Sequence, residues 1–306
     1  MFHFNDYELP LLWRELSRDH LAATVDLALD EDGAADDVTT RSLCAPSEVG
    51  RARVVTRAPA VCAGLGIVDE FVARDQRLSA TRVKRVVDGS MVATGTNLVE
   101  LEGPLTSILP IERSLLNLLG IAMGTATLTA EYVAAVVGTK AVVCDTRKTV
   151  PGLRWLQKYA VRCGGGHSHR WGLGDALLVK DNHIAGLAVD EYTQRIQTAV
   201  EKLRLLGTPL SFVCAEADTL QQFDALLALP VGIIDIALLD NFSNDALVTA
   251  VARRDRSRPT LQIEASGGVN LDSISAIART GVDRISVGAL THSARWADVA
   301  LDINAG

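Results

Sequence analysis

Residues 162–175, RCGGGHSHRWGLGD, hold the densest group of chemically useful side chains in the sequence. Two histidines one residue apart, His167 and His169, could hold a zinc ion. Glycines followed by histidine and arginine are instead typical of an anion pocket, because glycine lets the backbone turn tightly toward a ligand. Arg162 and Arg170 flank the histidines and would repel a divalent cation, which counts against the zinc site.

Further basic residues follow or end apolar runs that we predict to be strands. Arg147 and Lys148 follow the run KAVVCD, and Lys180 ends the run DALLVK. A buried ammonium without a partner is costly, so we expect Lys180 to have an anionic partner. Arg113, near the start of a long apolar segment, is a further candidate. Several cations around one site indicate a ligand that carries several negative charges.

Two carboxylates, Glu216 and Asp240, end apolar runs in the same way. They could form ion pairs with the neighbouring cations, or accept hydrogen bonds from ligand hydroxyls. They could also bind Mg²⁺, which prefers carboxylate oxygens. These roles are compatible, so we predict a site in which carboxylates and cations face one ligand.

Two glycine-bearing loops indicate a phosphate site. Ser266, Gly267 and Gly268 follow a predicted strand. The helix predicted from Leu271 comes next, and the dipole of a helix favours an anion at its N-terminus. Gly288 ends the following strand. Loops of this kind after the last two strands are the usual phosphate site of α/β barrels.

The elements that would position these residues alternate along the second half of the chain. Strands and helices follow one another without hairpin signals, which indicates parallel strands joined by helices. An open sheet and a barrel both fit, but polar residues end every strand, which favours a barrel. Six strands fall short of eight, so we expect an incomplete α/β barrel. The predicted strands span 140–145, 175–180, 210–216, 232–240, 260–266 and 283–289, and the helices 151–163, 189–207, 218–229, 244–255 and 271–281.

Proline and glycine mark the ends of some of these helices. Pro151 suits the first turn of a helix, and Gly207 and Gly281 suit helix ends. A nearly all-apolar segment at 112–138 precedes them and predicts a long buried helix.

The first part of the chain predicts an α+β domain over residues 1–112, beside a barrel domain over 113–290. We expect the C-terminal tail, 291–306, to join the first domain. Asp88-Gly89 lies between apolar runs and predicts a β-hairpin. Other strands are predicted at 51–57, 60–66 and 97–104, and helices at 9–30 and 67–75.

Composition limits the class of protein. The chain has 306 residues, 48% of them hydrophobic, which is ample for a packed core. A formal charge of −7 argues against a nucleic-acid or membrane partner. The five cysteines are scattered and form no C-x-x-C pair, and the N-terminal segment does not have the pattern of a signal peptide. We therefore expect a cytoplasmic protein with reduced thiols.

These residues by themselves indicate an enzyme with a sugar-phosphate site, and they leave the reaction open. Phosphoribosyl transfer fits. A phosphosugar aldolase or isomerase also fits, with Lys180 forming a Schiff base. A metal hydrolase would use His167 and His169, at the electrostatic disadvantage described above. A non-catalytic binding module would not need charged groups on so many strand ends.

Motifs along nearly the whole chain resemble nicotinate-nucleotide pyrophosphorylases (carboxylating), that is, quinolinate phosphoribosyltransferases. These motifs are DTRKTVPGLRW, CGGGHSHRWGLGD, LLVKDNHI, ALLDNF and EASGGVN, and earlier EDGAADDVTT, VVDGSMVATGTNLVELEGP and ERSLLNLL. The resemblance implies a type II phosphoribosyltransferase fold, with an N-terminal α+β sandwich domain and an incomplete, seven-stranded α/β barrel. It implies a pentosyltransferase of NAD biosynthesis, which makes nicotinate mononucleotide, pyrophosphate and CO₂ from quinolinate and phosphoribosyl pyrophosphate.

The resemblance also implies how the cations are used. Quinolinate would face Arg147, His169, Arg170 and Lys180, while Lys148 would lie near the pyrophosphate. Arg113 would reach in from the other subunit of a homodimer, or of a higher oligomer.

Glu216 and Asp240 would face the ribose hydroxyls and Mg²⁺, which is the one cofactor implied. With Lys148 and Lys180 they form the expected catalytic set. The 5′-phosphate would be held by Ser266, Gly267, Gly268 and Gly288.

A few positions depart from the family pattern. Ser168 stands where the family usually has asparagine, and Cys214 where it commonly has glutamate. Gly120 and Met123 replace residues that are usually glutamine and serine. The departures at Ser168 and Cys214 are the support for the alternative of a ModD-like paralogue, which has the same fold and acts on another small ligand.

Overall fold

The computed structural model describes residues 4–83 and 85–304, so residues 1–3, Lys84 and 305–306 of the predicted domains lie outside the described residues. The chain divides into two compact units, each built from segments that are far apart in the sequence. The barrel unit comprises 1–6, 131–148 and 166–289, and the antiparallel unit comprises 7–130, 149–165 and 290–306. The domain boundary at 112/113 stays a prediction.

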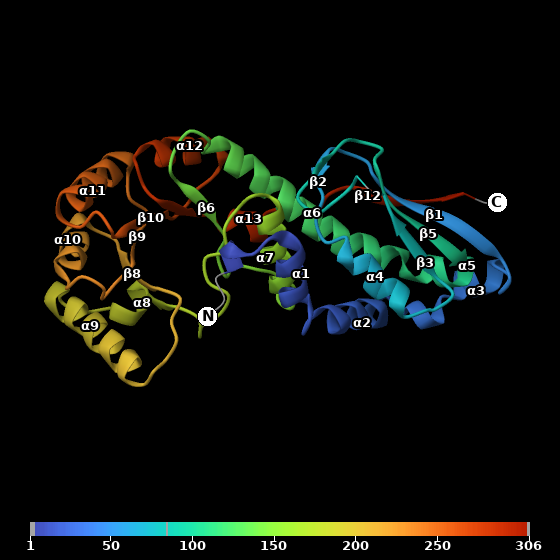
Figure 1. Cartoon of the computed structure of the whole chain (residues 1–306), viewed down its shortest axis with the longest axis horizontal. Coiled ribbons are helices and arrows are strands. Elements are labelled where there is room, and N and C mark those ends of the chain that lie inside the picture. The colour runs from blue at the N-terminus through green and yellow to red at the C-terminus, as the bar shows by residue number, and fades with distance from the viewer. Residues whose placement is uncertain (1–3, 84, 305–306) are drawn as a thin grey trace. The chain divides into compact units, whose positions relative to one another are not determined.

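A parallel sheet forms the centre of the barrel unit, and all six predicted strands are present (Figure 1). Its order is β6-β11-β10-β9-β8-β7, so the first strand pairs with the last. Pairing of the first strand with the last is what closes a sheet into a barrel, whereas in an open sheet the two need not be neighbours. The strands are β6 (Val142–Cys144), β7 (Leu177–Val179), β8 (Val213–Ala217), β9 (Ile236–Asp240), β10 (Gln262–Ser266) and β11 (Arg284–Ser286).

A seventh position is occupied by the chain around His167. Its backbone forms a parallel bridge with Cys144 in β6, in which His167 N–H donates to the carbonyl of Val143 over 2.8 Å. In the described part of the chain no strand ladder joins this segment to β7, so the ring of strands is open there. The expected incomplete barrel is therefore confirmed.

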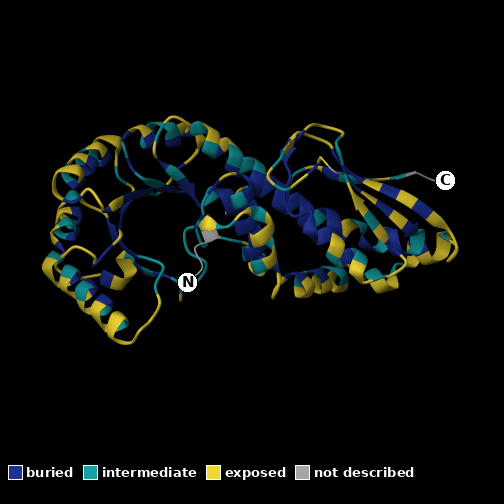
Figure 2. Cartoon of the chain, in the orientation of Figure 1, coloured by how far each residue is buried: buried dark blue, intermediate teal, exposed yellow. Residues whose placement is uncertain are grey.

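Helices cover the outside of these strands (Figure 1), and their buried faces turn inward while exposed residues face out (Figure 2). The predicted helix ends at Gly207 and Gly281 are confirmed: both glycines follow a helix closely and have positive φ, 65° and 91°. The helices are α8 (Asp181–Ile184), α9 (Val189–Leu205), α10 (Leu220–Ala228), α11 (Asn244–Ser257) and α12 (Leu271–Arg279), with the short helix η1 (Phe4–Asp6) also in this unit.

A buried arginine fastens the N-terminal side of β9. The Arg258 side chain donates hydrogen bonds to the carbonyls of Leu229, at 3.2 Å, and Ile234, at 3.0 Å. Longer contacts reach two further carbonyls, those of Leu226 and Pro230. One side chain thus donates to carbonyls of the turn between α10 and β9 that lie outside both elements.

We predict that Arg258→Met lowers the free energy of unfolding by about 3 kcal/mol, because the substitution removes the donor to the carbonyls of Leu229 and Ile234. Arg256→Met is the matched control, since Arg256 is exposed on the same helix and its loss should change stability by less than about 0.5 kcal/mol. Denaturant unfolding of both variants measures the difference. Equal stability of the two would contradict this role for Arg258.

The antiparallel unit contains a four-stranded sheet of order β12-β1-β5-β3 and a separate two-stranded pair, β2-β4. The predicted strands at 51–57 and 97–104 are present as β1 (Val49–Thr56) and β5 (Asn97–Pro104). The tail supplies β12 (Val299–Asn304), which pairs antiparallel with β1. The other strands are β2 (Ala60–Val61), β3 (Ser79–Arg82) and β4 (Met91–Val92).

The helices of this unit include the long apolar helix α6 (Glu112–Ala135), which extends into the barrel unit. The stretch Leu105–Ala135 could cross a membrane by length and composition, but 56% of its most apolar window is buried inside the protein. A core helix passes the same test, which fits the predicted buried helix. The others are α1 (Leu9–Ser17), α2 (Leu21–Asp32), η2 (Ala34–Asp36), α3 (Val38–Leu43), α4 (Gly66–Ala73), α5 (Leu105–Ile108), η3 (Leu109–Ile111), α7 (Arg154–Cys163) and α13 (Ala289–His292).

The hairpin predicted at Asp88-Gly89 is wrong. Strand β4, which follows it, pairs with β2 and not with the residues before the turn. The Asp88 carboxylate instead accepts hydrogen bonds from the Tyr159 hydroxyl, at 2.6 Å, and from Leu65 N–H, at 3.2 Å. The turn itself forms, since Ser90 N–H donates to the Val87 carbonyl over 3.0 Å, but it does not join two paired strands.

Three other boundaries differ from the sequence prediction. Pro151 lies in a turn before α7, which begins at Arg154, so its placement in the first helical turn is wrong. The predicted strand at 60–66 ends at Val61, because Gly66 already opens α4. The helix predicted at 9–30 is interrupted between α1 and α2 by a turn around His20.

Candidate active site at the carboxyl end of the barrel

The predicted site residues of the barrel unit all lie at or just after the carboxyl ends of its strands. We call this end of the barrel the rim. Arg113 is the exception, since it lies exposed on α6 in the antiparallel unit. The rim carries Arg147 and Lys148 after β6, His169 and Arg170 after the His167 bridge, Lys180 after β7, Glu216 in β8, Asp240 in β9, Ser266, Gly267 and Gly268 at the end of β10, and Gly288 after β11.

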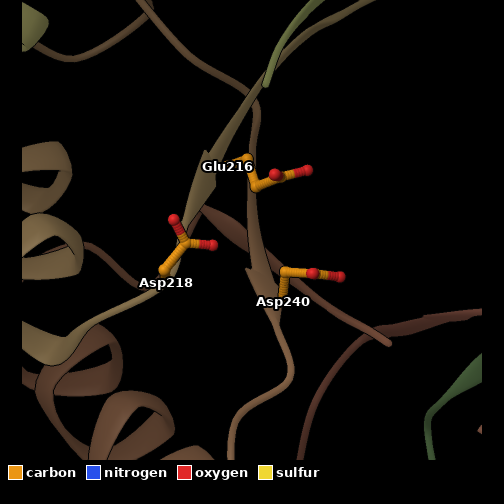
Figure 3. Close-up of side chains that lie close together, drawn as sticks. All are labelled: Glu216, Asp218 and Asp240. Atoms are coloured by element: carbon orange, nitrogen blue, oxygen red, sulfur yellow. The ribbon is translucent and has the colours of Figure 1, made fainter. Parts of the chain in front are cut away.

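Three carboxylates meet on this rim (Figure 3). Glu216, Asp218 and Asp240 each offer an oxygen, and these oxygens lie within 4.8 Å of one another. Glu216 and Asp240 come from the neighbouring strands β8 and β9 and point the same way, while Asp218 follows the end of β8. We call these three residues the carboxylate cluster. It brings together the two predicted metal ligands, and hard oxygen donors of this kind suit Mg²⁺.

Asp218 was not among the predicted site residues. Burial raises its pKa, and the negative charges of Asp240 and Asp181 raise it further, against the opposing effect of Lys180. The signal that could have found it is the spacing Glu-x-Asp at a strand end, which places two carboxylates at one point of the rim.

Lys180 has the anionic partner that its sequence position predicts. Its ammonium forms an ion pair with Glu216, whose side chain is 4% exposed. Burial lowers the pKa of Lys180, but the hydrogen bond and charge of Glu216 outweigh it, so the pKa is raised overall. A Schiff-base lysine must react as the neutral amine, so this environment argues against the aldolase hypothesis.

The backbone around Lys180 is also fixed. Lys180 N–H donates to Nδ1 of His183 over 2.9 Å, and Asp181 N–H lies 3.3 Å from a Glu216 oxygen. Within the KDNH motif, the side chain of His183 in α8 thus holds the backbone of Lys180, the residue that precedes the helix. His183 was not a predicted site residue, although its motif carried part of the family resemblance.

Asn241 links the carboxylate cluster to the glycine loop. It has a φ of 56°, and its side-chain amide donates to the Asp240 carboxylate over 2.7 Å. Its backbone N–H donates to the carbonyl of Ser266 over 2.9 Å. A Cβ on Gly267 would come within 2.8 Å of the Asn241 nitrogen, so only glycine fits there. Sequence reasoning missed Asn241, whose signal is the LDNF motif.

The glycine loop leads directly into α12. Gly268 has a φ of 58°, and the Asn270 side chain caps the helix by accepting from Ser273 N–H over 3.0 Å. The structure thus has the predicted order of strand, glycine turn and helix N-terminus, which is the arrangement that suits a phosphate.

His169 is held deep beneath the rim. Its backbone N–H donates to the buried Asp145 carboxylate over 2.8 Å, and its Nε2 lies 3.1 Å from a Glu264 oxygen. The other Glu264 oxygen accepts from Arg284 Nε over 2.8 Å. Burial alone would raise the pKa of Glu264, but His169 and Arg284 lower it to about 2, so the carboxylate is charged.

Two arginines face the same region with like charge. Burial lowers the pKa of Arg170, and the nearby charge of Arg147 lowers it further. The carboxylate of Asp175 only partly offsets this repulsion, since it also accepts from the backbone of Trp171, at 2.6 Å, and Gly172, at 3.0 Å. An arrangement that holds two guanidinium groups close together is suited to an anionic ligand. Lys148 is exposed beside them.

Two departures from the family pattern are buried. The backbone of Ser168 is bracketed by the Asn5 amide, which accepts from its N–H at 2.8 Å and donates to its carbonyl at 3.0 Å. Cys214 is fully buried in β8, and burial followed by the charge of Glu264 raises the pKa of its thiol. A neutral thiol avoids a second negative charge next to Glu264.

Comparisons with known proteins agree on one family. The chain matches the quinolinate phosphoribosyl transferase C-terminal domain over residues 125–302 and the N-terminal domain over 37–123. It is 42% identical to the nicotinate-nucleotide pyrophosphorylase [carboxylating] of Mycobacterium leprae, over 87% of this chain and 91% of that one. It is 36% identical to the probable enzyme of that name from Bacillus subtilis, over 89% and 90%.

Solved structures show the same likeness. The nicotinate-nucleotide pyrophosphorylase of Francisella tularensis aligns with 99% of this chain and 100% of its own, at a TM-score of 0.84 and 33% identity. The enzyme of that name from Ehrlichia chaffeensis aligns with 92% and 97%, at a TM-score of 0.81 and 34% identity.

Proposed function

The chain belongs to the quinolinate phosphoribosyl transferase family, and we propose that its rim joins quinolinate to the phosphoribosyl group of phosphoribosyl pyrophosphate. The products are nicotinate mononucleotide, pyrophosphate and CO₂, which makes the protein a pentosyltransferase of NAD biosynthesis. The observation that carries the proposal is the rim itself, where paired cations, a carboxylate cluster and a glycine loop all follow strand ends of one barrel.

The charges of the rim match those of the two substrates. Quinolinate has two carboxylates, and phosphoribosyl pyrophosphate is phosphorylated at both ends, so the two repel each other unless cations lie between them. Burial and the nearby charge of Arg147 lower the pKa of Arg170, and a bound anion would offset this repulsion. We propose that these arginines, with His169 and Lys180, bind quinolinate, and that Lys148 contacts the pyrophosphate.

The carboxylates suit the sugar. Bond breaking at the ribose carbon leaves positive charge on the ring, which fixed negative charges stabilise without reorganisation. We propose that Glu216 and Asp240 face the ribose and its hydroxyls. Asn241 holds Asp240 in place, and the ion pair with Lys180 holds Glu216.

Magnesium is the cofactor that we propose. Glu216, Asp218 and Asp240 would hold it, directly or through water, since their three oxygens converge within 4.8 Å. When bound, Mg²⁺ supplies positive charge that neutralises the leaving pyrophosphate.

Loss of CO₂ needs no organic cofactor. Ribosylation of the ring nitrogen gives a pyridinium, and its positive charge stabilises the carbanion that forms when the adjacent carboxylate leaves as CO₂. The protein has to hold the ring and its second carboxylate in place. The 5′-phosphate would bind at Ser266, Gly267 and Gly268, ahead of α12, and at Gly288.

We propose a homodimer, or a higher oligomer, in which Arg113 completes the partner's site. Support comes from a cavity of about 550 Å³ in the antiparallel unit, lined by α2, α6 and Trp296, and including Ser114 next to Arg113. Leu27 and Trp296 on its wall are 68% and 59% exposed, and exposed apolar surface of this kind is typical of an interface. The five free cysteines fit the cytoplasmic location that we propose.

The substrate is tested directly. The protein with quinolinate, phosphoribosyl pyrophosphate and Mg²⁺ should release nicotinate mononucleotide and CO₂ in equal amounts. Chromatography measures the mononucleotide, and a labelled carboxylate on quinolinate measures the CO₂. Nicotinate in place of quinolinate should give little product, because it lacks the carboxylate that is lost. Turnover of nicotinate or another acid, with none of quinolinate, would refute the substrate and favour the ModD-like alternative.

Mixing two inactive variants tests the shared site. Arg113→Ala and Lys180→Met would each abolish most activity alone. If Arg113 acts across the interface, dissociation and reassociation of an equal mixture gives mixed dimers with one intact site each, so about a quarter of the wild-type activity should return. Sedimentation of each variant controls for dimer formation. A mixture of normal dimers that recovers nothing would show that Arg113 acts within its own subunit.

A further inference from the structure

We propose that Glu264 is the positioning residue for His169 and so sets the affinity for the pyridine dicarboxylate. The inference rests on the proposed function, which assigns His169 to quinolinate. Glu264 lies in β10 with a side chain that is 0% exposed, and so it cannot touch a ligand itself. It acts through the imidazole, whose Nε2 is 3.1 Å from its Oε1.

Arg284 holds the Glu264 carboxylate in place, and this carboxylate in turn holds the imidazole of His169. Glu264 and Arg284 are paired in register on the neighbouring strands β10 and β11, and Arg284 Nε donates to Glu264 Oε2 over 2.8 Å. Oε2 of Glu264 thereby accepts from the neighbouring strand, and Oε1 faces His169 in the loop. A carboxylate engaged on both sides has one orientation.

His169 is held at three further points in addition to Glu264. Its backbone N–H donates to Asp145 over 2.8 Å, beyond the end of β6. The ring packs edge-to-face on Phe212, with ring centres 5.2 Å apart at 86°. The bridge between His167 and Cys144 anchors the chain two residues earlier. The loop has no strand ladder of its own, so these contacts determine where the ring lies.

The arrangement decides which ring nitrogen serves the ligand. Nε2 lies within ion-pair distance of Glu264 Oε1, at 3.1 Å, so Nδ1 is the nitrogen left for a ligand carboxylate. Only a doubly protonated ring carries N–H on both nitrogens, so a ring that bridges Glu264 and a ligand carboxylate is an imidazolium in the complex. The other charged or titratable groups around the pair are Arg284, Asp145, Cys144 and Cys214.

Glu264→Gln tests this role because an amide cannot serve both neighbours. Arg284 and the Nε2–H of His169 each need an acceptor, and glutamine offers one oxygen where glutamate offers two. The oxygen will go to the guanidinium, and the NH₂ group will face the imidazole. The ring nitrogen must then become an acceptor, so the ring is neutral and carries its proton on Nδ1. It can still donate one hydrogen bond to a ligand carboxylate, but it no longer offers the positive charge of an imidazolium.

We expect the Kd and the KM for quinolinate to rise about 10- to 100-fold in Glu264→Gln, as for other residues that orient a ligand-binding histidine. The KM for phosphoribosyl pyrophosphate should change by less than about twofold, since the Glu264 side chain contacts His169 and Arg284, which we do not assign to that substrate. Calorimetry of quinolinate binding and steady-state kinetics measure these values. The ¹⁵N spectrum of His169 should show the proton moving from Nε2 to Nδ1.

Asp283→Asn is the matched control. Like Glu264, Asp283 is a carboxylate with basic partners on both sides, here Lys140 and Arg254. It is partly buried and lies before β11, at the opposite end of the barrel. The Asp283→Asn protein should be less stable than the wild type, and its KM values for quinolinate and phosphoribosyl pyrophosphate should be unchanged. Glu264→Asp, which keeps two acceptor oxygens, should restore part of the affinity and serves if Glu264→Gln does not fold.

The outcomes are separable. Unchanged quinolinate affinity in both Glu264 variants, with stability loss like that of Asp283→Asn, would show that Glu264 is only an internal ion pair. Failure of the wild-type protein to bind or turn over quinolinate would instead refute the proposed function itself.

Discussion

Replacing Lys180 by methionine should lower kcat/KM for nicotinate mononucleotide formation about 10³-fold, the scale of losing one electrostatic group from a preorganised site. The ammonium balances Glu216, whose side chain is 4% exposed. Without it, an unpaired carboxylate would face two polyanionic substrates. Steady-state kinetics with both substrates varied, and an unfolding curve for the variant, measure the effect and separate it from loss of fold.

Lys180→Arg is the control that distinguishes the two lysine chemistries. Arginine keeps the positive charge beside Glu216 but has no primary amine, so phosphoribosyl transfer should retain part of its rate, within roughly tenfold of wild type. A Schiff-base enzyme would lose all activity in both variants. Equal and complete loss, together with covalent trapping of a carbonyl substrate by borohydride in the wild-type protein, would favour the aldolase hypothesis.

Replacing Asp240 by asparagine should have the second large effect. The change removes one of three converging charges from the carboxylate cluster and leaves one neutral amide oxygen, in place of a charged carboxylate, to accept from the Asn241 amide. We expect the rate to fall on the order of 10²-fold or more. The Mg²⁺ concentration that gives half-maximal rate should rise roughly tenfold or more. Rates measured across a Mg²⁺ titration report both.

Two further aspartate variants serve as comparisons for Asp240→Asn. Asp218→Asn should raise the Mg²⁺ requirement less, since Asp218 is exposed, whereas Asp240 is partly buried. Asp224→Asn should change nothing, because Asp224 pairs with Arg253 on the outer helices. An Asp240→Asn protein with an unchanged Mg²⁺ requirement would remove Asp240 from the proposed metal ligands.

The barrel could be predicted because its signals are local. Each strand is a short apolar run that ends on a polar residue, and in each helix the apolar residues recur with helical spacing. All six strands could therefore be predicted. The chain around His167 escaped this approach, since a single bridge to Cys144 has no periodicity. Its membership of the barrel depends on β6, more than twenty residues earlier.

The site could be predicted only in part for a related reason. Residues that end strands could be named from the sequence, and Glu216 and Asp240 do meet. The contact of His169 with Glu264 joins residues whose separation in the chain is large, and it depends on strand register, which no local pattern encodes. The same holds for the turn at Asp88, where β4 pairs with β2, far earlier in the chain, and does not form the predicted hairpin.

The pairing of β12 with β1 has a consequence for synthesis of the chain. β1 ends at Thr56, whereas its partner begins at Val299, so one edge of β1 has no partner until the chain has been synthesised as far as β12. A nascent sheet with an open edge can pair with other chains, and chaperones act on such intermediates. Chains that stop before Val299 should therefore aggregate more readily than chains that include β12, which makes the pairing of this strand a late condition for a protected β1 edge.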